Sequence, residues 1–109
     1  MAYDEGLAQL LRDDLADEAG VSEKLMFGGL CFMLNGHMLC GVSAKGQMFR
    51  VGKSHEAEAR AIDGAGPMQF TGRPMGGMID VTEQAFVDDA RRARWLQLAM
   101  ANARSLPAK

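Results

Sequence analysis

The two ends of the chain carry the residue spacing of amphipathic helices. Near the N-terminus, Leu7, Leu11 and Leu15 recur every four positions with charged residues between them, which predicts a helix that Gly20 stops. Near the C-terminus, Thr82 is expected to cap a long helix that runs to about Arg104. The apolar stripe of that helix is Phe86, Ala90, Ala93, Leu96, Met100 and Ala103. A shorter helix is predicted from a cap at Ser54 to about Ile62.

Strands are predicted between these helices. Two apolar runs flank Asn35-Gly36, a pair that accepts the positive φ angles of a type I′ turn, so residues 24–42 are predicted to form a β-hairpin. The other expected strands are 47–52, 68–70 and 78–81. The predicted order is α-β-β-β-α-β-β-α, which is typical of an α+β fold: a two-layer α/β sandwich with helices on one face of an antiparallel sheet.

Length and net charge limit the number of domains and the classes of partner that the chain can have. A chain of 109 residues is expected to form a single domain over residues 1–109. The net charge of −2 gives no electrostatic reason for strong nucleic-acid binding. Residues 1–23 hold seven acids against Arg12 alone, which predicts either a solvated acidic helix face or a surface that orients a partner.

The chain shows no sign of export or of a membrane segment. Its first residues lack the basic and then apolar regions of a signal peptide, so a cytoplasmic location is expected. The longest apolar stretch, residues 25–34, is too short to span a bilayer, and no membrane partner is predicted.

The predicted hairpin has apolar side chains on both faces. With Asn35 and Gly36 as the turn, one face carries Cys31, Met33, Met38, Cys40 and Val42. The other face carries Leu30, Phe32, Leu34, His37 and Leu39. An antiparallel sheet with one solvent-exposed face alternates apolar and polar residues. Because both faces of this hairpin are apolar, the second face is expected to be buried against something other than the main helical layer. We expect a homodimer or a protein partner there; the alternative is that the first or last helix wraps around the sheet.

The same register places Cys31 directly opposite Cys40. Their Cα atoms would lie about 4.5 Å apart, which is short enough for a cross-strand disulfide, so the two are a candidate redox pair. The alternative is that both are buried, reduced thiols that act as small hydrophobic side chains, because no neighbouring base lowers their pKa.

The sequence carries no complete signature of a catalytic site. The only histidines are His37 and His55, and the sequence after His55 lacks the second histidine of a zinc-binding His-Glu-x-x-His helix. No catalytic residue, cofactor or metal site is therefore predicted.

Arg73 and a group of three arginines on the last helix are candidates for anion binding. Arg73 lies in a predicted Gly- and Pro-rich loop over residues 71–77, where it would either hold an anion or stay solvated. Arg91, Arg92 and Arg94 on the last helix suggest DNA contact, but Asp88 and Asp89 are placed three or four residues earlier and can pair with them locally.

Several motifs together resemble one family. Met26-Phe27-Gly28-Gly29 is followed by Asn35-Gly36, by a Gly-rich stretch over residues 72–77 and by Trp95 in the last helix. This arrangement resembles the N-terminal domain of the TfoX/Sxy competence regulators, and it covers most of the chain from Lys24 onward. The chain ends soon after Trp95, so we expect a stand-alone domain that lacks the family's C-terminal domain.

The resemblance implies a two-layer fold similar to secretion chaperones. The function we expect is a non-enzymatic protein-interaction domain with a role in regulation. The alternatives are a DNA-contacting transcriptional regulator and a small-molecule-binding enzyme. The candidate interaction or ligand residues are Met26, Phe27, Gly28, Gly29 and Arg73.

Overall fold

The chain folds into one antiparallel sheet with its helices on a single face. The computed structural model describes residues 3–26, 28–70 and 73–107, with the backbone alone described at 68–70 and 73–75. The strands are β1 (Val21–Met26), β2 (Gly29–Leu34), β3 (His37–Ser43), β4 (Gly46–Arg50), β5 (Ala65–Phe70) and β6 (Arg73–Val81). The helices are α1 (Glu5–Asp14), the 3-10 helix η1 (Lys53–His55), α2 (Glu56–Arg60), α3 (Glu83–Phe86) and α4 (Asp89–Arg104).

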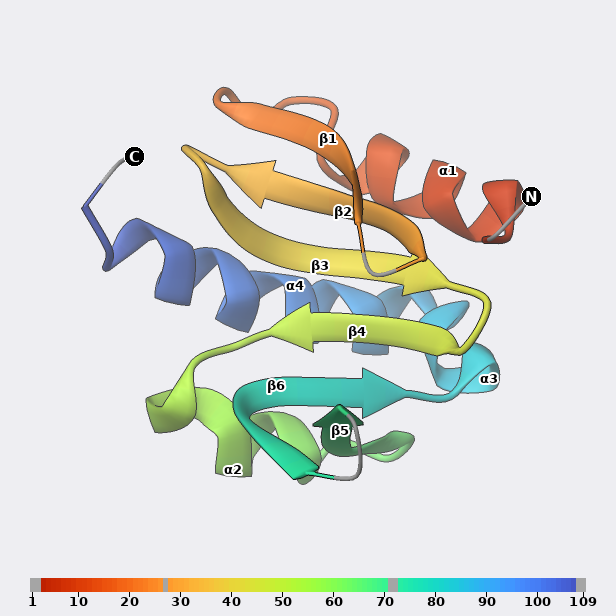
Figure 1. The fold of residues 1–109 in the computed structure, drawn as a ribbon, viewed down its shortest axis with the longest axis vertical. Helices are drawn as coiled ribbons and strands as arrows, with labels where there is room; N and C mark the ends of the chain where they lie inside the picture. The colour runs from red at the N-terminus through yellow and green to blue at the C-terminus, as the bar shows by residue number, and fades with distance from the viewer. Residues whose placement is uncertain (1–2, 27, 71–72, 108–109) are drawn as a thin grey trace.

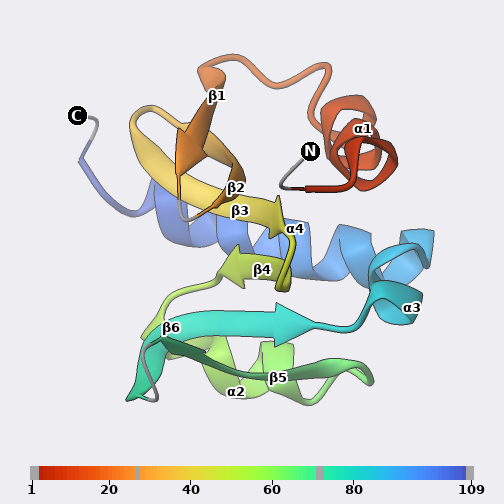
Figure 2. The ribbon, with the colours of Figure 1, turned by 45° about the vertical axis from the view of Figure 1, so that its right-hand side comes forward.

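The sheet has six strands in the order β1-β2-β3-β4-β6-β5. Helix α4 runs behind its centre, α1 lies behind the β1–β2 end, and α2 lies behind β5 and β6 (Figure 1). The view in Figure 2 confirms that α1, α2 and α4 share one face of the sheet. The α+β class and the order of the predicted elements are therefore confirmed.

Two features were absent from the prediction. The first arm of the predicted hairpin is divided: residues 24–26 belong to β1, an edge strand that begins at Val21, and β2 begins at Gly29. The last helix is divided: Thr82 caps α3 as predicted, accepting from the N–H of Ala85, and Asp88 then caps α4 by accepting from the N–H of Arg91.

Two local predictions are corrected. Ser54 does not cap a helix, because it lies inside η1, and α2 begins at Glu56 without a side-chain cap. The stretch predicted as a loop over 71–77 is largely strand, since β6 begins at Arg73; residues 71–72 lie outside the described part of the chain. Gly77 has φ +83°, and a Cβ there would lie 3.3 Å from the backbone of Gly52, so this glycine permits a close backbone approach.

The predicted turn and the two predicted pairs next to it, Leu34–His37 and Met33–Met38, are confirmed, and the predicted register is wrong beyond Met33. Asn35 and Gly36 have φ angles of 52° and 88°, as a type I′ turn requires. The β2–β3 register then shifts between Phe32 and Met33, which leaves Leu39 as an extra residue in β3. Phe32 therefore pairs with Cys40, and Cys31 pairs with Gly41.

The bulge redistributes side chains between the two faces of the sheet. Cys40 and Val42 join the helix-side core, where the predicted residues Leu30, Phe32, Leu34 and Leu39 also lie. At the centre of that core Trp95 is fully buried, its indole N–H donates to the carbonyl of Ala59 at 3.0 Å, and its ring lies 5.8 Å from that of Phe49. The helices thus cover the centre of one apolar face.

The opposite face carries a smaller cluster of buried side chains. It consists of Cys31, Met38, Met48 and Met78, with Met26 and Met33 packed against it. Helices α1, α2 and α4 all pack on the other face, so the alternative in which the first or last helix wraps around the sheet is wrong (Figure 1). We name these six residues the sulfur face. Within the described part of the chain, no helix is long and apolar enough to cross a membrane.

Candidate functional site

The family-like motif forms the tight connection between β1 and β2. Gly28 has φ +71°, a left-handed conformation that favours glycine. A Cβ at Gly29 would lie 2.2 Å from the carbonyl oxygen of Val42, so only glycine lets β2 approach β3 this closely. Phe27 lies outside the described residues. Backbone conformation therefore accounts for glycine at position 28, and close strand packing accounts for it at position 29.

The motif also lines an open groove of about 330 Å³. Its lining residues are Tyr3, Leu25, Met26, Gly28 and Gly29, and we name it the Leu25 groove. The Leu25 side chain is 71 % exposed, although large apolar side chains elsewhere in the described chain are mostly buried. Tyr3 packs against the helix-side core from the segment before α1. The structure thus brings together three of the four predicted motif residues beside an exposed leucine.

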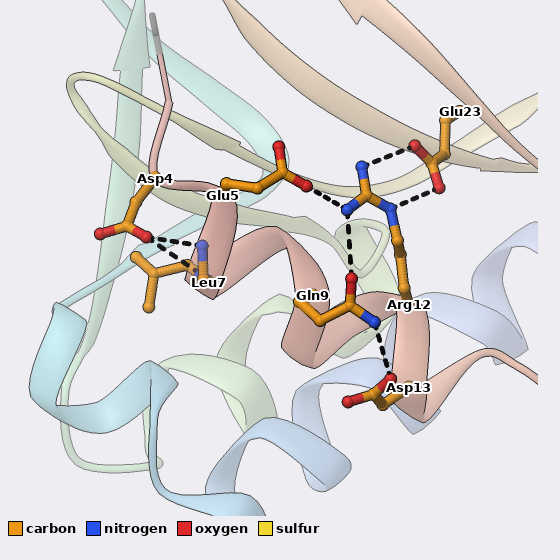
Figure 3. A network of polar contacts seen from close by, with 8 residues as sticks. Asp4, Glu5, Leu7, Gln9, Arg12, Asp13 and Glu23 are labelled. Carbon is orange, nitrogen blue, oxygen red and sulfur yellow. Dashed lines mark hydrogen bonds and ion pairs between the residues drawn. The ribbon is translucent and has the colours of Figure 1, made fainter.

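An ion-pair network fastens β1 to α1 next to this groove (Figure 3). Arg12 donates from Nε and Nη2 to the two carboxylate oxygens of Glu23 at 2.9 and 3.1 Å, and Nη1 donates to Glu5 and to Gln9. The hydrogen bond from Arg12 holds the pKa of Glu5 below its ordinary value. Glu23 and Leu25 share one face of β1, because side chains alternate along a strand. The network therefore fixes α1 beside the groove.

The acidic N-terminal segment is largely compensated within the chain. Besides the Arg12 pairs, Asp4 caps α1 by accepting from the N–H groups of Gly6 and Leu7, at 2.8 and 3.2 Å. Glu18 pairs with Arg104 at 2.9 Å. These acids thus serve internal contacts as well as the solvated face that the sequence suggested.

The arginines of the last helix form local ion pairs, as the alternative interpretation predicted. Arg92 is only 3 % exposed and pairs with Asp14 at 2.6 Å and with Asp89 at 2.8 Å, so the suggestion that it contacts DNA is wrong. Arg91 pairs with Asp88 at 2.9 Å. Arg94 is exposed on the same helix. Two of the three arginines that suggested DNA binding are therefore paired with aspartates of the same chain.

The cysteines do not form the predicted cross-strand pair. Cys31 lies on the sulfur face and Cys40 in the helix-side core, and both are free and buried. Burial raises the pKa of both thiols. Their placement agrees with the alternative of two separate buried thiols.

Arg73 belongs to β6, where its backbone pairs with Phe70 at the start of the β5–β6 hairpin. Its side chain lies outside the described part of the structure. An anion site at Arg73 stays a prediction.

A larger and more polar groove of about 960 Å³ lies where the start of α1, the β3–β4 turn and the start of α3 meet. Gln47 is 6 % exposed on its floor, with Lys45 and Asp80 beside it. Burial raises the pKa of Asp80. In the described ranges, no three His, Cys, Asp or Glu side chains gather to hold a metal ion. This groove offers polar contacts but no assembled set of acid, base and nucleophile.

Sequence reasoning missed two residues of the Leu25 groove. Tyr3 is the single tyrosine of the chain and precedes the first helix, where no periodic pattern marks it. Leu25 stands in an apolar run, so its exposure became visible only with the edge position of β1. The one feature of the sequence that could have indicated the exposure of Leu25 is its position directly after the charged pair Glu23-Lys24.

Fold and site together define an α+β domain whose glycine-rich β1–β2 connection lines an apolar groove at one end of the sheet. The sequence pattern of the TfoX N-terminal domain matches residues 13–103, which is most of the chain, so this protein belongs to the TfoX N-terminal domain family. Searches among curated proteins and among solved structures gave no match.

Proposed function

We propose that this protein is a non-catalytic, protein-binding domain with a regulatory role, and that the Leu25 groove is its contact site. The observation that carries the proposal is the 71 % exposure of Leu25 beside the family motif. An exposed leucine at a groove with a charged rim matches the usual anatomy of interfaces, an apolar centre surrounded by polar groups. Glu23 lies two residues before Leu25 on the same face of β1, and its ion pair with Arg12 supplies polar groups near the groove.

The charges of β1 favour a different protein over a second copy joined edge to edge. Two β1 strands related by a twofold axis must pair residues of the same face, because side chains alternate along a strand. Pairing near the middle of β1 then sets Glu23 against Glu23 or Lys24 against Lys24. Like charges directly opposite are destabilising, and edge charges of this kind are a common protection against self-association.

The contact is tested by placing a photoreactive amino acid at position 25. Irradiation in cells that produce the protein is expected to give a covalent adduct with another protein. The matched control places the same amino acid at Val87, which is 49 % exposed and lies outside the groove. Adducts of equal yield at both positions, or at neither, would overturn the proposal. An adduct with a second copy of the chain would replace the proposed partner with a homodimer.

A second measurement separates binding from folding. Leu25→Ser removes apolar contact area from an exposed site, so the complex should be lost while the unfolding midpoint stays within experimental error of the wild type. Val87→Ser is the control and should retain the complex. If Leu25→Ser retains the complex as well, the groove is not the contact site.

A further inference from the structure

The sulfur face differs from the rest of the interior in composition. Its members, Met26, Cys31, Met33, Met38, Met48 and Met78, all carry sulfur. In the larger helix-side core the buried sulfur residues are Cys40 and Met100, among many leucines, valines, isoleucines and aromatic residues. Ordinary packing is served well by branched and aromatic side chains, as that core shows. A cluster of sulfur alone calls for a chemical explanation.

Strand register places several of these side chains next to one another on one face of the sheet. Met33 and Met38 are direct partners across β2 and β3, so their side chains lie next to each other on one face. Two residues along, Cys31 is paired with Gly41, and Gly41 is paired with Met48 on β4. Because Gly41 has no side chain, Met48 reaches across it toward Cys31. A Cβ placed on Gly41 would lie 3.0 Å from Cε of Met48 and 3.1 Å from Sγ of Cys31.

We propose that the sulfur face binds a soft monovalent cation, Cu(I), with Cys31 and Met48 as ligands and with Met33 or Met38 completing the site. Thiolate and thioether groups are the protein ligands that select Cu(I), whereas carboxylates and carbonyls select hard cations. The four candidate donors come from three adjacent strands of the sheet. Methionine side chains have three rotatable bonds and can turn their sulfur toward an ion without moving the backbone.

The binding step balances without a redox partner. Sγ of Cys31 forms a bond to Cu(I) and releases its thiol proton to solvent, and no electron is transferred. Lys24 is the strand partner of Cys31 on β1 and lies on the same face of the sheet. Met33 and Met26 are half-buried, so the ion can enter past them. Met38, Met48 and Met78 are between 4 % and 8 % exposed and shield the bound ion from water.

The test uses the full chain under anaerobic, reducing conditions. Cu(I) is titrated in competition with a chromophoric Cu(I) chelator, and Ag(I), which does not change oxidation state, is titrated by calorimetry. The wild type is expected to bind one equivalent of either ion. Cys31→Ala removes the thiolate and should weaken binding by more than the roughly 10–100-fold that loss of an outer-sphere partner costs.

Two matched substitutions separate this site from nonspecific thiol binding. Cys40→Ala removes the other cysteine, which lies on the opposite face, and should leave Cu(I) affinity unchanged. Met48→Leu keeps volume and apolar character at a buried position and should weaken binding, whereas Met100→Leu should not. The proposal is overturned if the wild type does not compete with the chelator. It is equally overturned if folded Cys31→Ala and Met48→Leu proteins bind as the wild type does, or if Cys40→Ala weakens binding as much as Cys31→Ala.

Discussion

Arg92 donates to both carboxylate oxygens of Asp14, at 2.6 and 3.3 Å, and so fastens the last long helix to the end of the first. The guanidinium also donates to the carbonyl of Phe86, the last residue of α3, at 3.0 Å. Its hydrogen bond to Asp14 is the main cause that raises the pKa of Arg92. One buried cation thereby joins three helices on the same face of the sheet.

Removal of Asp14 should therefore be costly. Asp14→Ala leaves a buried charge with only Asp89 as its remaining carboxylate, and Asp89 is 88 % exposed in its side chain. We expect a loss of about 2–4 kcal/mol in the free energy of unfolding, measured by urea denaturation. Glu18→Ala breaks a surface pair with Arg104 and should cost less than about 1 kcal/mol. Equal losses in the two variants would show that Arg92 does not depend on Asp14.

Elements with strong periodicity were predictable, but the buried stripe of the last helix was predicted only in part, because Ala90 and Ala93 are exposed whereas Trp95 and Ala99 are buried. Leu7, Leu11 and Leu15 placed α1, although it ends at Asp14 and does not continue to Gly20, and Thr82 marked the start of α3, because helical spacing and capping are local properties of the sequence. The turn at Asn35-Gly36 was equally local. These features need no knowledge of distant residues.

The register and the edge strands were not predictable for physical reasons. Both faces of the hairpin are apolar, so inserting Leu39 as a bulge leaves the hydrophobic pattern intact while it moves Cys40 to the other face. Glycine and proline in residues 71–77 suggested a loop, although Gly77 in fact permits close contact between β6 and Gly52. The Leu25 groove depends on β1 being at an edge, which is a long-range property.

Gly29 should be the least replaceable residue of the motif. In Gly29→Ala the added Cβ would lie 2.2 Å from the carbonyl of Val42 and 2.7 Å from Cβ of Ser43, so β2 must move away from β3. We expect destabilisation of about 2–3 kcal/mol, as for overpacked interiors. Gly66→Ala is the control, because a Cβ there meets nothing within 4 Å, and thermal unfolding should scarcely change. A Gly29→Ala protein as stable as the control would contradict the close approach.

The Glu5 contact with Arg12 should give stability a pH dependence on the acid side. The pKa of Glu5 is lowered from an ordinary value of 4.5, so its contribution is fully present above that pH and is lost as the pH falls through the lowered pKa. The difference in stability between wild type and Glu5→Gln should therefore shrink as the pH drops below 4.5. Denaturant midpoints at low ionic strength measure it, because salt screens exposed pairs. Glu58→Gln, on α2, is the control: it leaves the Arg12 network intact, so its stability difference from the wild type should not shrink in this way. If the stability difference between wild type and Glu5→Gln stays constant as the pH falls, the contact with Arg12 does not depend on the charge of Glu5.

Cys31 and Cys40 should not form an intramolecular disulfide in the folded protein. They stand on opposite faces of the sheet, and a disulfide requires Cβ atoms that face each other at about 3.5–4.5 Å. Burial also raises the pKa of both thiols, so little reactive thiolate is present at neutral pH. After mild oxidation of the native protein, both thiols should titrate once the chain is unfolded, and the intact mass should be unchanged. Loss of both thiols with the mass of one internal disulfide would mean that β2 and β3 can slip into the register without the bulge.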